Sequence, residues 1–304
     1  MIFRSFIITV FLIIIYSLSL RYVNQSAKGP GQHQWQDNLI KAEKYLLHSD
    51  TSKQFVIVGS SLSCRLIMDS LPANFINLSF GGLSLFDGLE IIKTKQRKPA
   101  IVFIETNIIK KPSSPEFLKK VKNPFMLAFK KSIPALEEVN QPSTLMGNYC
   151  QFKIDTVVTN PFLVWIFNPV VDKLNSTITK TKKSEYNTLV TDFNQKAFNE
   201  YNTPVPSELL QKQISQLKLT IKQLEKEGVR FVFFELPMYA KTENSIQMQQ
   251  IRNGLNQSFP KGTYIYMQQP NYSNYVTSDG MHLDGENAKK FTLFFREQFY
   301  KLIK

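Results

Sequence analysis

Ser61 and His282 are the residues of this 304-residue chain from which a nucleophilic mechanism could be built. Ser61 follows an apolar run, residues 55–58, and precedes a stretch with helical character. A strand-to-helix turn displays its side chains at the carboxyl end of a sheet, where open α/β folds place their sites. The helix that starts there would point unpaired N–H groups and a positive dipole end at a bound group. The turn alone also fits two simpler interpretations, a serine that caps a helix and a phosphate-binding turn.

Three histidines could serve as the base that takes the serine proton. His33 lies in an expected linker, and His48 precedes the first expected strand, at the amino end of the sheet. His282 comes directly before the last expected helix, and Asp279 stands three residues earlier. Asp279 can fold back and accept the Nδ1–H of His282, which would fix the tautomer and stabilise the imidazolium. The simpler interpretation is a polar loop in which Asp284 caps the following helix.

The segments that must position these residues alternate between apolar β-type runs and helical patterns. This alternation predicts an α/β fold, a doubly wound, three-layer domain with a five-stranded parallel sheet. The expected strands are residues 54–59, 75–79, 100–107, 230–237 and 263–267. The expected helices are residues 35–47, 62–68, 85–95, 207–228, 245–259 and 284–303.

The alternation breaks between residues 108 and 206, where prolines recur and lysines dominate the charge. We expect a mainly helical insertion there, within an α/β domain formed by residues 35–107 and 207–304. Residues 157–171 are the most apolar stretch beyond the N-terminus, but they are too short and too broken by proline to span a bilayer. They fit a lid, a membrane-facing patch or the core of the insertion.

The N-terminal residues 1–22 predict a transmembrane signal anchor, followed by a linker over residues 23–34. Residues 2–20 are almost wholly apolar, with one charge at Arg4, and no clear signal-peptide cleavage site follows them. We therefore expect the rest of the chain to lie outside the cytosol. The alternative is a buried core helix.

The composition favours acidic partners, since 37 Lys and Arg against 24 Asp and Glu give a formal charge of +13. Anionic lipid and anionic glycan fit this charge. No nucleic-acid-binding module is recognisable, so no nucleic-acid partner is expected. Two cysteines, Cys64 and Cys150, are too few for a disulfide scaffold or a metal cluster, and no metal or cofactor is expected.

Four short blocks, in order along the chain, resemble the SGNH/GDSL hydrolase superfamily. Residues 59–63 resemble its first block, Gly-Asp-Ser-Leu, and residues 77–82 its second, which centres on a glycine. Residues 105–107 resemble the third block, which ends in asparagine, and Asp279 with His282 match the last, Asp-x-x-His. The resemblance covers about residues 50–110 and 207–304.

The resemblance implies a site with a Ser-His-Asp triad of Ser61, His282 and Asp279. It further implies an oxyanion hole formed by the backbone N–H groups of Ser61 and Ser79 and by the side chain of Asn107.

Four substitutions depart from the family pattern. Ser60 and Ile108 stand where the family has aspartates, and Ser79 and Glu105 stand where it has glycines. Because an oxyanion donor at Ser79 would be its backbone N–H, the loss of that glycine changes the shape of the hole more than its number of donors.

The Gly-Ser-Ser form, the N-terminal anchor and the basic charge are most similar to the membrane-anchored acyl-transfer branch. The resemblance implies a bacterial extracytoplasmic enzyme that moves an acetyl or D-alanyl group onto an envelope glycan through an acyl-Ser61 intermediate. It also implies a multispanning membrane O-acyltransferase as a partner. Two alternatives remain open: an esterase, and a non-catalytic subunit that binds glycan or helps assembly.

Overall fold

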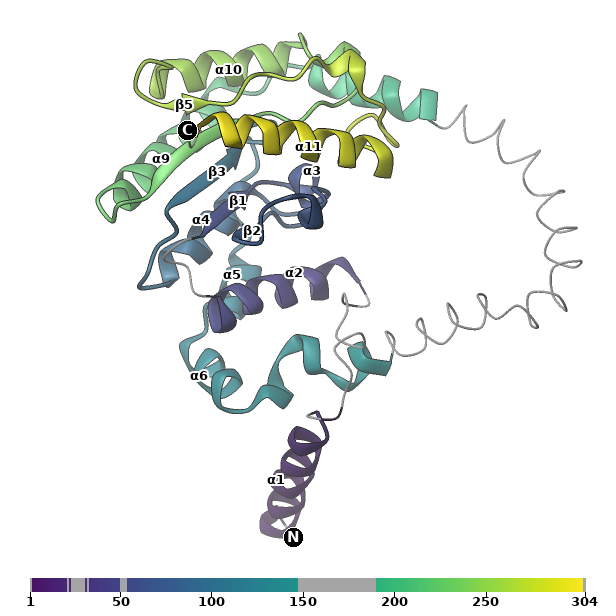
Figure 1. The fold of residues 1–304 in the computed structure, drawn as a ribbon, viewed down its shortest axis with the longest axis vertical. Coiled ribbons are helices and arrows are strands. Elements are labelled where there is room, and N and C mark those ends of the chain that lie inside the picture. Colours follow the sequence, from purple (N-terminus) through teal and green to yellow (C-terminus); the bar gives the residue numbers. More distant parts are fainter. Residues whose placement is uncertain are drawn as a thin grey trace, which may run out of the picture. The chain divides into compact units, whose positions relative to one another are not determined.

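The computed structural model describes residues 2–20, 22, 31, 33–49, 54–146 and 190–302. Contacts between residues divide the chain into two compact units. The first comprises Met1–His48 with Lys120–Ser184, and the second comprises Ser49–Lys119 with Glu185–Lys304 (Figure 1). Both Ser61 and His282 belong to the second unit.

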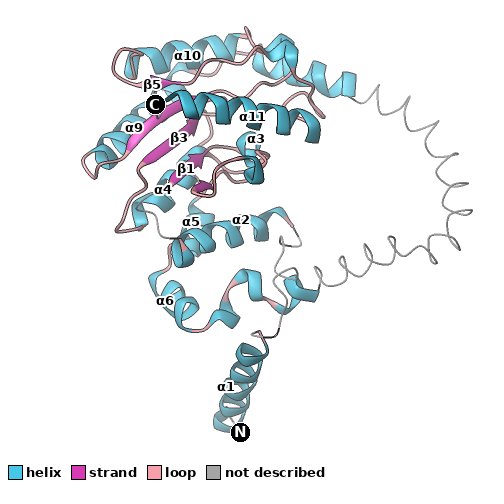
Figure 2. Cartoon of the chain, in the orientation of Figure 1, coloured by secondary structure: helices cyan, strands magenta, loops and turns pink. Residues whose placement is uncertain are grey.

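A parallel five-stranded sheet, in the order β2-β1-β3-β4-β5, forms the centre of the second unit (Figure 2). The expected α/β fold with this sheet is thus confirmed. The strand order reverses between β1 and β3, which is where doubly wound sheets bind ligands at their carboxyl ends. The strands are β1 (Phe55–Val58), β2 (Phe75–Asn77), β3 (Ile101–Glu105), β4 (Arg230–Phe234) and β5 (Ile265–Tyr266). β5 is shorter than the strand expected over residues 263–267.

The last helix, α11 (Gly285–Leu302), covers one face of this sheet. Three of its phenylalanines, Phe291, Phe295 and Phe299, recur every four residues, so they share one side of the helix. All three are buried, and Phe295 and Phe299 contact aromatic side chains of the strands; for example, the ring centroids of Phe295 and Phe103 lie 5.3 Å apart. The buried aromatic stripe therefore fixes the helix that directly follows the Asp279–His282 loop.

The other long helices of this unit are α4 (Leu85–Thr94), α9 (Ser207–Glu225) and α10 (Ile246–Ser258). α4 packs on the face of β1 that carries Val58, since side chains alternate along a strand and Ile57 belongs to the α11 side. A Cβ atom on Gly88 would lie 2.8 Å from Val58 Cγ1, so glycine permits this close approach. α9 contacts both α4 and α10, so these three helices pack as one connected group.

Short helices connect these elements. α3 (Ser61–Cys64) ends at residue 64, whereas the helix was expected to continue to residue 68. The reason is that Arg65 leaves helical geometry at φ −83° and ψ 0°. The other short helices of the second unit are η3 (Met68–Ser70), η6 (Ala240–Thr242) and η7 (Tyr272–Asn274). α5 (Pro115–Val121) lies where the chain passes between the units.

Residues 190–201, in the expected insertion, are helical and belong to the second unit. Tyr201 is buried in the core cluster that α11 and the strands form. The end of the expected insertion therefore contributes to the core of the α/β domain. The apolar stretch at residues 157–171 lies outside the described residues.

The first unit is helical in its described parts. Its elements are α1 (Ile2–Ser19), α2 (Gln34–Glu43), η2 (Lys44–His48), α6 (Pro124–Ser132), η4 (Pro134–Leu136) and η5 (Glu138–Asn140). A buried ion pair joins Glu43 to Lys130, and Glu43 Oε2 also accepts the Glu138 N–H at 2.8 Å. These bonds tie α2 to α6 and η5.

None of the helices in the described part of the chain is both long and apolar enough to cross a membrane. The transmembrane helix expected over residues 1–22 is therefore not found.

Candidate active site

The turn after β1 places Ser61 at the carboxyl edge of the sheet. Gly59 ends the strand, and Ser60 caps α3, because its Oγ accepts the Leu62 N–H at 3.2 Å. Only glycine fits at position 59, since an added Cβ would lie 2.2 Å from Ser63 Oγ and 2.5 Å from a Glu105 oxygen. The tight turn fixes the direction of the next side chain, that of Ser61.

Ser61, His282 and Asp279 form one hydrogen-bonded chain. Ser61 Oγ lies 2.7 Å from His282 Nε2, and His282 Nδ1 lies 2.7 Å from Asp279 Oδ2. A charged carboxylate can only accept, so Nδ1 carries the hydrogen and Nε2 accepts from the serine hydroxyl. This is the arrangement in which a histidine can take the proton of a serine nucleophile.

The Asp279 carboxylate is held in its charged form by its own loop. Burial raises the pKa of Asp279, but the hydrogen bonds from the backbone and ring of His282 lower it by more than burial raises it. The net pKa therefore lies below the usual range. Asp279 Oδ1 accepts the His282 N–H at 2.7 Å and the Met281 N–H at 3.1 Å. A lowered folded pKa contributes stability above the unfolded pKa, and this contribution is lost as the pH falls through the folded value.

The loop that carries the histidine is anchored on both sides. Thr277 and Leu283 form an antiparallel bridge, and Arg65 Nη1 donates to Leu283 O at 3.2 Å. Gly280 has φ +81°, and an added Cβ would lie 2.7 Å from Ala197 Cβ in the 190–201 helix. A bridge within the loop and two outside segments, those of Arg65 and Ala197, therefore set the position of His282.

Glu105, at the end of β3, holds the turn that carries Ser61. Its Oε2 accepts the Ser60 N–H at 2.8 Å and the Ser63 N–H at 3.2 Å. The hydroxyls of Ser60 and Ser63 lie 2.9 and 2.7 Å from the same oxygen. The side chain is 1 % exposed. Glu105 is thus a positioning residue for the segment that includes Ser61.

Burial raises the pKa of Glu105, and the hydrogen bonds from Ser60 and Ser63 only partly offset this effect. In the sequence, Glu105 stood out only because the SGNH/GDSL pattern has a glycine at this position. An acidic residue that ends an otherwise apolar, doubly buried strand was the signal that could have identified its structural part.

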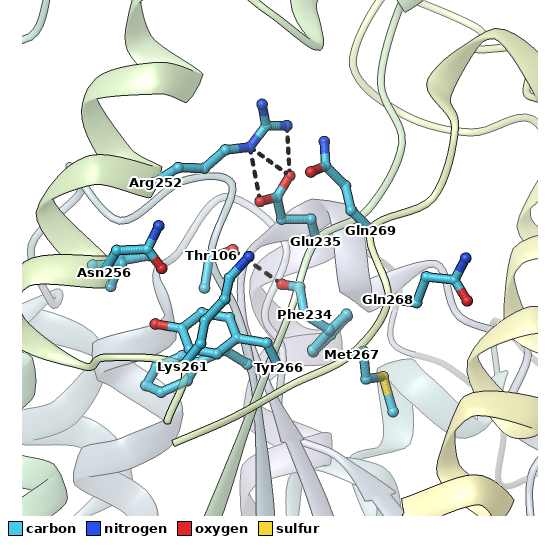
Figure 3. A pocket seen from close by; sticks show the side chains of 12 residues that line it. Thr106, Phe234, Glu235, Arg252, Asn256, Lys261, Tyr266, Met267, Gln268 and Gln269 are labelled. Atoms are coloured by element: carbon cyan, nitrogen blue, oxygen red, sulfur yellow. Dashed lines mark hydrogen bonds and ion pairs between the residues drawn. The ribbon is translucent and has the colours of Figure 1, made fainter. Parts of the chain in front are cut away.

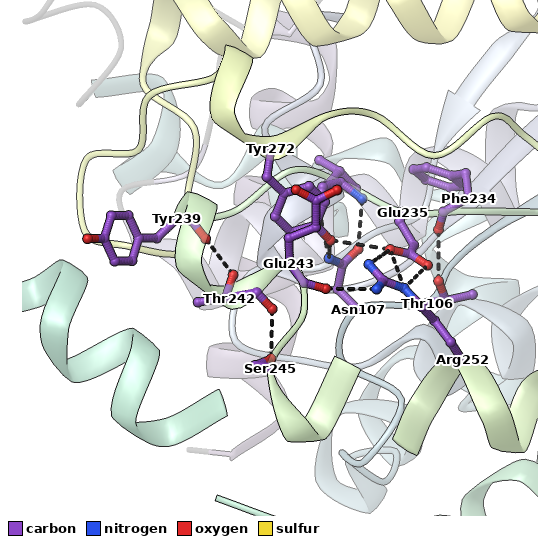
Figure 4. Close-up of polar contacts among 11 residues, drawn as sticks. Thr106, Asn107, Phe234, Glu235, Tyr239, Thr242, Glu243, Ser245, Arg252 and Tyr272 are labelled. Atoms are coloured by element: carbon purple, nitrogen blue, oxygen red, sulfur yellow. Dashed lines mark hydrogen bonds and ion pairs between the residues drawn. The ribbon is translucent and has the colours of Figure 1, made fainter. Parts of the chain in front are cut away.

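The Asn107 side chain has partners other than a bound oxyanion (Figure 4). Its Nδ2 donates to Leu236 O at 2.8 Å and to Tyr272 Oη at 3.2 Å, and its Oδ1 accepts the Leu236 N–H at 2.8 Å. Both amide hydrogens are therefore engaged, and the residue is 1 % exposed. In this arrangement Asn107 joins the end of β3 to the segment after β4 and does not offer the oxyanion donor that the resemblance implies.

The backbone N–H of Ser79 is also engaged, because it donates to Asn77 Oδ1 at 2.9 Å. Asn77 Nδ2 in turn donates to Ser63 O at 2.7 Å, so this asparagine fixes α3 to the end of β2. The Ser61 N–H, by contrast, has no hydrogen-bond partner among the residues that the structure describes. Of the three predicted oxyanion donors, Ser61 N–H is the one left available.

A separate cavity of about 300 Å³ opens at the carboxyl ends of β4 and β5 (Figure 3). Neither Ser61 nor His282 lines it. Within the described parts of the chain, no group of three or more histidine, cysteine, aspartate or glutamate residues could hold a metal ion. Cys150 lies outside those parts.

Comparison of the chain with models of protein families and with curated protein sequences gives no match. The chemistry of the site therefore rests on its own geometry.

Proposed function

We propose that this protein is a serine acyl-transfer enzyme with Ser61 as its nucleophile. The single observation that supports the proposal is the continuous chain from Ser61 Oγ through His282 to Asp279, with both hydrogen bonds at 2.7 Å. Ser61 and His282 are 221 positions apart in the sequence, yet they form a hydrogen bond. The order of the three residues and the tautomer of His282 are those that nucleophilic catalysis requires.

In the first half of the proposed reaction, Ser61 Oγ attacks the carbonyl carbon of an acyl ester while its proton passes to His282 Nε2. Asp279 stabilises the imidazolium through Nδ1–H. The Ser61 N–H donates to the developing oxyanion. The bond to the leaving alcohol then breaks, the alcohol takes the proton from His282, and an acyl-Ser61 ester remains.

In the second half, an acceptor hydroxyl gives its proton to His282 Nε2 and attacks the acyl-Ser61 carbonyl. Collapse of this intermediate releases Ser61, which recovers the proton, and leaves the acyl group on the acceptor. We propose that the acceptor is a hydroxyl of an envelope glycan and that the transferred group is of the acetyl or D-alanyl type. Water in the same position would make the protein an esterase.

The resemblance to SGNH/GDSL hydrolases supports this proposal, since its first and last blocks supply the residues of the chain. The departures also have a structural counterpart. Ser60 replaces the family aspartate, and Glu105, which replaces a glycine, supplies a carboxylate that bonds Ser60 from the neighbouring strand.

A location at the extracytoplasmic side of a bacterial membrane, beside a multispanning O-acyltransferase, is also part of the proposal. The formal charge of +13 favours anionic lipid or glycan at the surface. α1 exposes large apolar side chains, including Phe3, Phe6 and Phe11, which are 74, 64 and 59 % exposed. Such an exposed apolar surface favours contact with lipid or with a membrane protein.

A non-catalytic subunit that binds glycan is the second candidate function. The observation that favours it is the engagement of both the Asn107 amide and the Ser79 N–H, which leaves one of the three implied donors. Since removing one oxyanion donor from an enzyme costs about 10² to 10³ in rate, a site with a single donor would be slow.

The deciding experiment treats the full-length protein with p-nitrophenyl acetate and locates the acetyl group by peptide mass spectrometry. We expect acetylation of Ser61, with none on Ser60 or Ser63, and loss of the adduct in His282→Ala. Ser207→Ala, which changes an exposed serine at the start of α9, is the matched control and should acetylate normally. Failure of wild-type Ser61 to acetylate while a known serine esterase does so would contradict the proposal and favour the binding subunit.

A further inference from the structure

The cavity at the carboxyl ends of β4 and β5 has the lining of a binding site. It lies between α10 and the segment after β5, and its volume of about 300 Å³ is at the lower end of the range, about 300 to 1,000 Å³, for small-molecule sites. A cavity of this size accommodates one or two rings of a larger ligand. The residues on which the inference depends are Glu235, Arg252, Asn256, Lys261, Gln268 and Gln269.

Three neutral amides surround the opening. Figure 3 shows Asn256 on one side and Gln268 and Gln269 on the other. All three residues are exposed, and their side chains make no hydrogen bond with the described residues. A carboxamide can donate and accept at once, which matches the hydroxyl groups of a sugar, since each hydroxyl also does both.

The cavity wall between these amides contains an ion pair between Arg252 and Glu235. Arg252 Nη2 lies 2.8 Å from Glu235 Oε2, Arg252 Nε lies 3.0 Å from Glu235 Oε1, and Arg252 Nη1 donates to Glu243 O at 2.7 Å. The two charges cancel, so Glu235 does not repel an acidic ligand. Tyr272 Oη also donates to Glu235 at 3.3 Å, which fixes the pair to the loop before the catalytic histidine.

Lys261 supplies the remaining recognition group, and the Tyr266 ring supports it. The Tyr266 ring is stacked on Phe233 at 4.9 Å, and its hydroxyl donates to Phe259 O at 2.7 Å, so the ring is a fixed, flat wall. The Lys261 ammonium lies 5.9 Å from the centroid of this ring and makes no ion pair with the described residues. The ring therefore positions the ammonium that lies over it, and an exposed ammonium suits an acidic substituent.

We infer that this cavity binds an acidic sugar residue of a glycan, with its acid at Lys261 and its hydroxyls at Asn256, Gln268 and Gln269. This goes beyond acyl transfer at Ser61 and does not depend on it. If the glycan is also the acceptor, the cavity holds a part of the polymer away from the reacting hydroxyl, because Ser61 does not line the cavity.

The test uses hyaluronan tetrasaccharide as an acidic probe and chitotetraose as a neutral probe that shares its N-acetylglucosamine. Binding to the full-length protein is measured by saturation-transfer NMR and by titration calorimetry. We expect the acidic probe to bind more tightly than the neutral one. Lys261→Met should lower the affinity for the acidic probe by about tenfold, because a charge-assisted hydrogen bond is lost. The same substitution should remove the preference for the acidic probe over the neutral one.

Matched variants keep the result specific. Lys289→Met, which removes an exposed charge on α11, and Gln211→Ala, which removes an exposed amide on α9, should leave binding unchanged. The double variant of Gln268→Ala with Gln269→Ala should weaken both probes. Ser61→Ala should bind as the wild type does, so a failure of binding and a failure of acylation are separate results. Equal binding of the two probes, no binding of either, or equal weakening in Lys289→Met would overturn the inference.

Discussion

Two carboxylates lie at the carboxyl edge of the sheet, Glu105 at the end of β3 and Glu235 after β4. They differ in the groups that bond them. Glu105 accepts only from uncharged groups, the N–H and hydroxyl groups of Ser60 and Ser63. Glu235 is paired with the Arg252 guanidinium. Burial without a cation raises the pKa of Glu105. The Arg252 pKa, which burial alone would lower, is raised by Glu235.

This difference indicates what each carboxylate can do. A carboxylate that accepts many short bonds from one turn fixes the shape of that turn, and Glu105 does so for the segment containing Ser61. An ion pair between two elements fixes their spacing, and Glu235 with Arg252 does so for the strand end and α10 beside the cavity. The first region should therefore affect the reaction, and the second should affect stability and binding.

The largest expected effect separates the two carboxylates. Glu105→Ala leaves two buried N–H groups without their acceptor and should lower the free energy of unfolding by about 3 kcal/mol. It should also slow Ser61 acylation by about tenfold or more, because the nucleophile is no longer held. Glu235→Gln should leave the acylation rate of the folded protein unchanged. Urea unfolding and the acetylation rate are the measurements.

Glu105→Gln is the second variant, chosen because it keeps the volume of the side chain. It should remain folded, because its amide oxygen can accept the Ser60 and Ser63 N–H groups as Oε2 does. It should still slow acylation, since its amide nitrogen cannot accept the Ser60 hydroxyl hydrogen that Oε1 accepts. Equal acylation rates in Glu105→Gln and the wild type would contradict the prediction that Glu105 affects the reaction and Glu235 does not.

Asn107→Ala tests to which region that residue belongs. Because its amide joins Leu236 and Tyr272, we expect a loss of about 2 kcal/mol of unfolding free energy. The acetylation rate of the folded fraction should change by less than about threefold. Removal of an oxyanion donor lowers the reaction rate of an enzyme by about 10² to 10³. A fall of that size in Asn107→Ala would indicate that the Asn107 amide donates to the oxyanion.

The pH dependence of stability tests the charge of Glu105. Its folded pKa is raised, so the folded state keeps a proton that the unfolded state loses above about pH 4.3. Stability should therefore fall as the pH rises from there through the folded pKa, with a slope of at most about 1.4 kcal/mol per pH unit from this group.

The slope is measured by urea unfolding across the pH range, as the difference between wild type and Glu105→Gln. Glu208→Gln, an exposed glutamate on α9, is the matched control and should reproduce the wild-type curve. A difference that grows in the opposite direction, with the wild type gaining stability as the pH rises, would show that the charged form is favoured.

The smallest expected effect is that of Arg252→Lys. Lysine keeps the charge but loses the bidentate geometry and the bond to Glu243 O, so the free energy of unfolding should fall by about 1 kcal/mol. Acetylation of Ser61 should not change. A slower acetylation, measured in the same assay, would mean that the ion pair also positions the reaction.

Much of the sheet could be predicted from the sequence because its strands are continuous apolar runs, such as residues 101–104. Such runs are typical of parallel sheets, whose strands are buried on both faces. β5 was harder to delimit, because of its two residues at the sheet edge Ile265 is exposed and Tyr266 is half-buried. α3 was predicted too long, since Arg65 turns out of the helix to reach the loop of the histidine.

The sequence by itself determined that Ser61 and His282 could meet. Both follow elements whose direction is set by local patterns, and the carboxyl ends of parallel strands share one edge. Only the tertiary structure decided which donors remain available there. Asn107 is bonded across 129 and 165 positions and Glu105 across 42 and 45, and such long-range choices depend on how the chain packs. Local propensity extends over a few residues, whereas a hydrogen-bond partner is whichever group the finished core brings within reach.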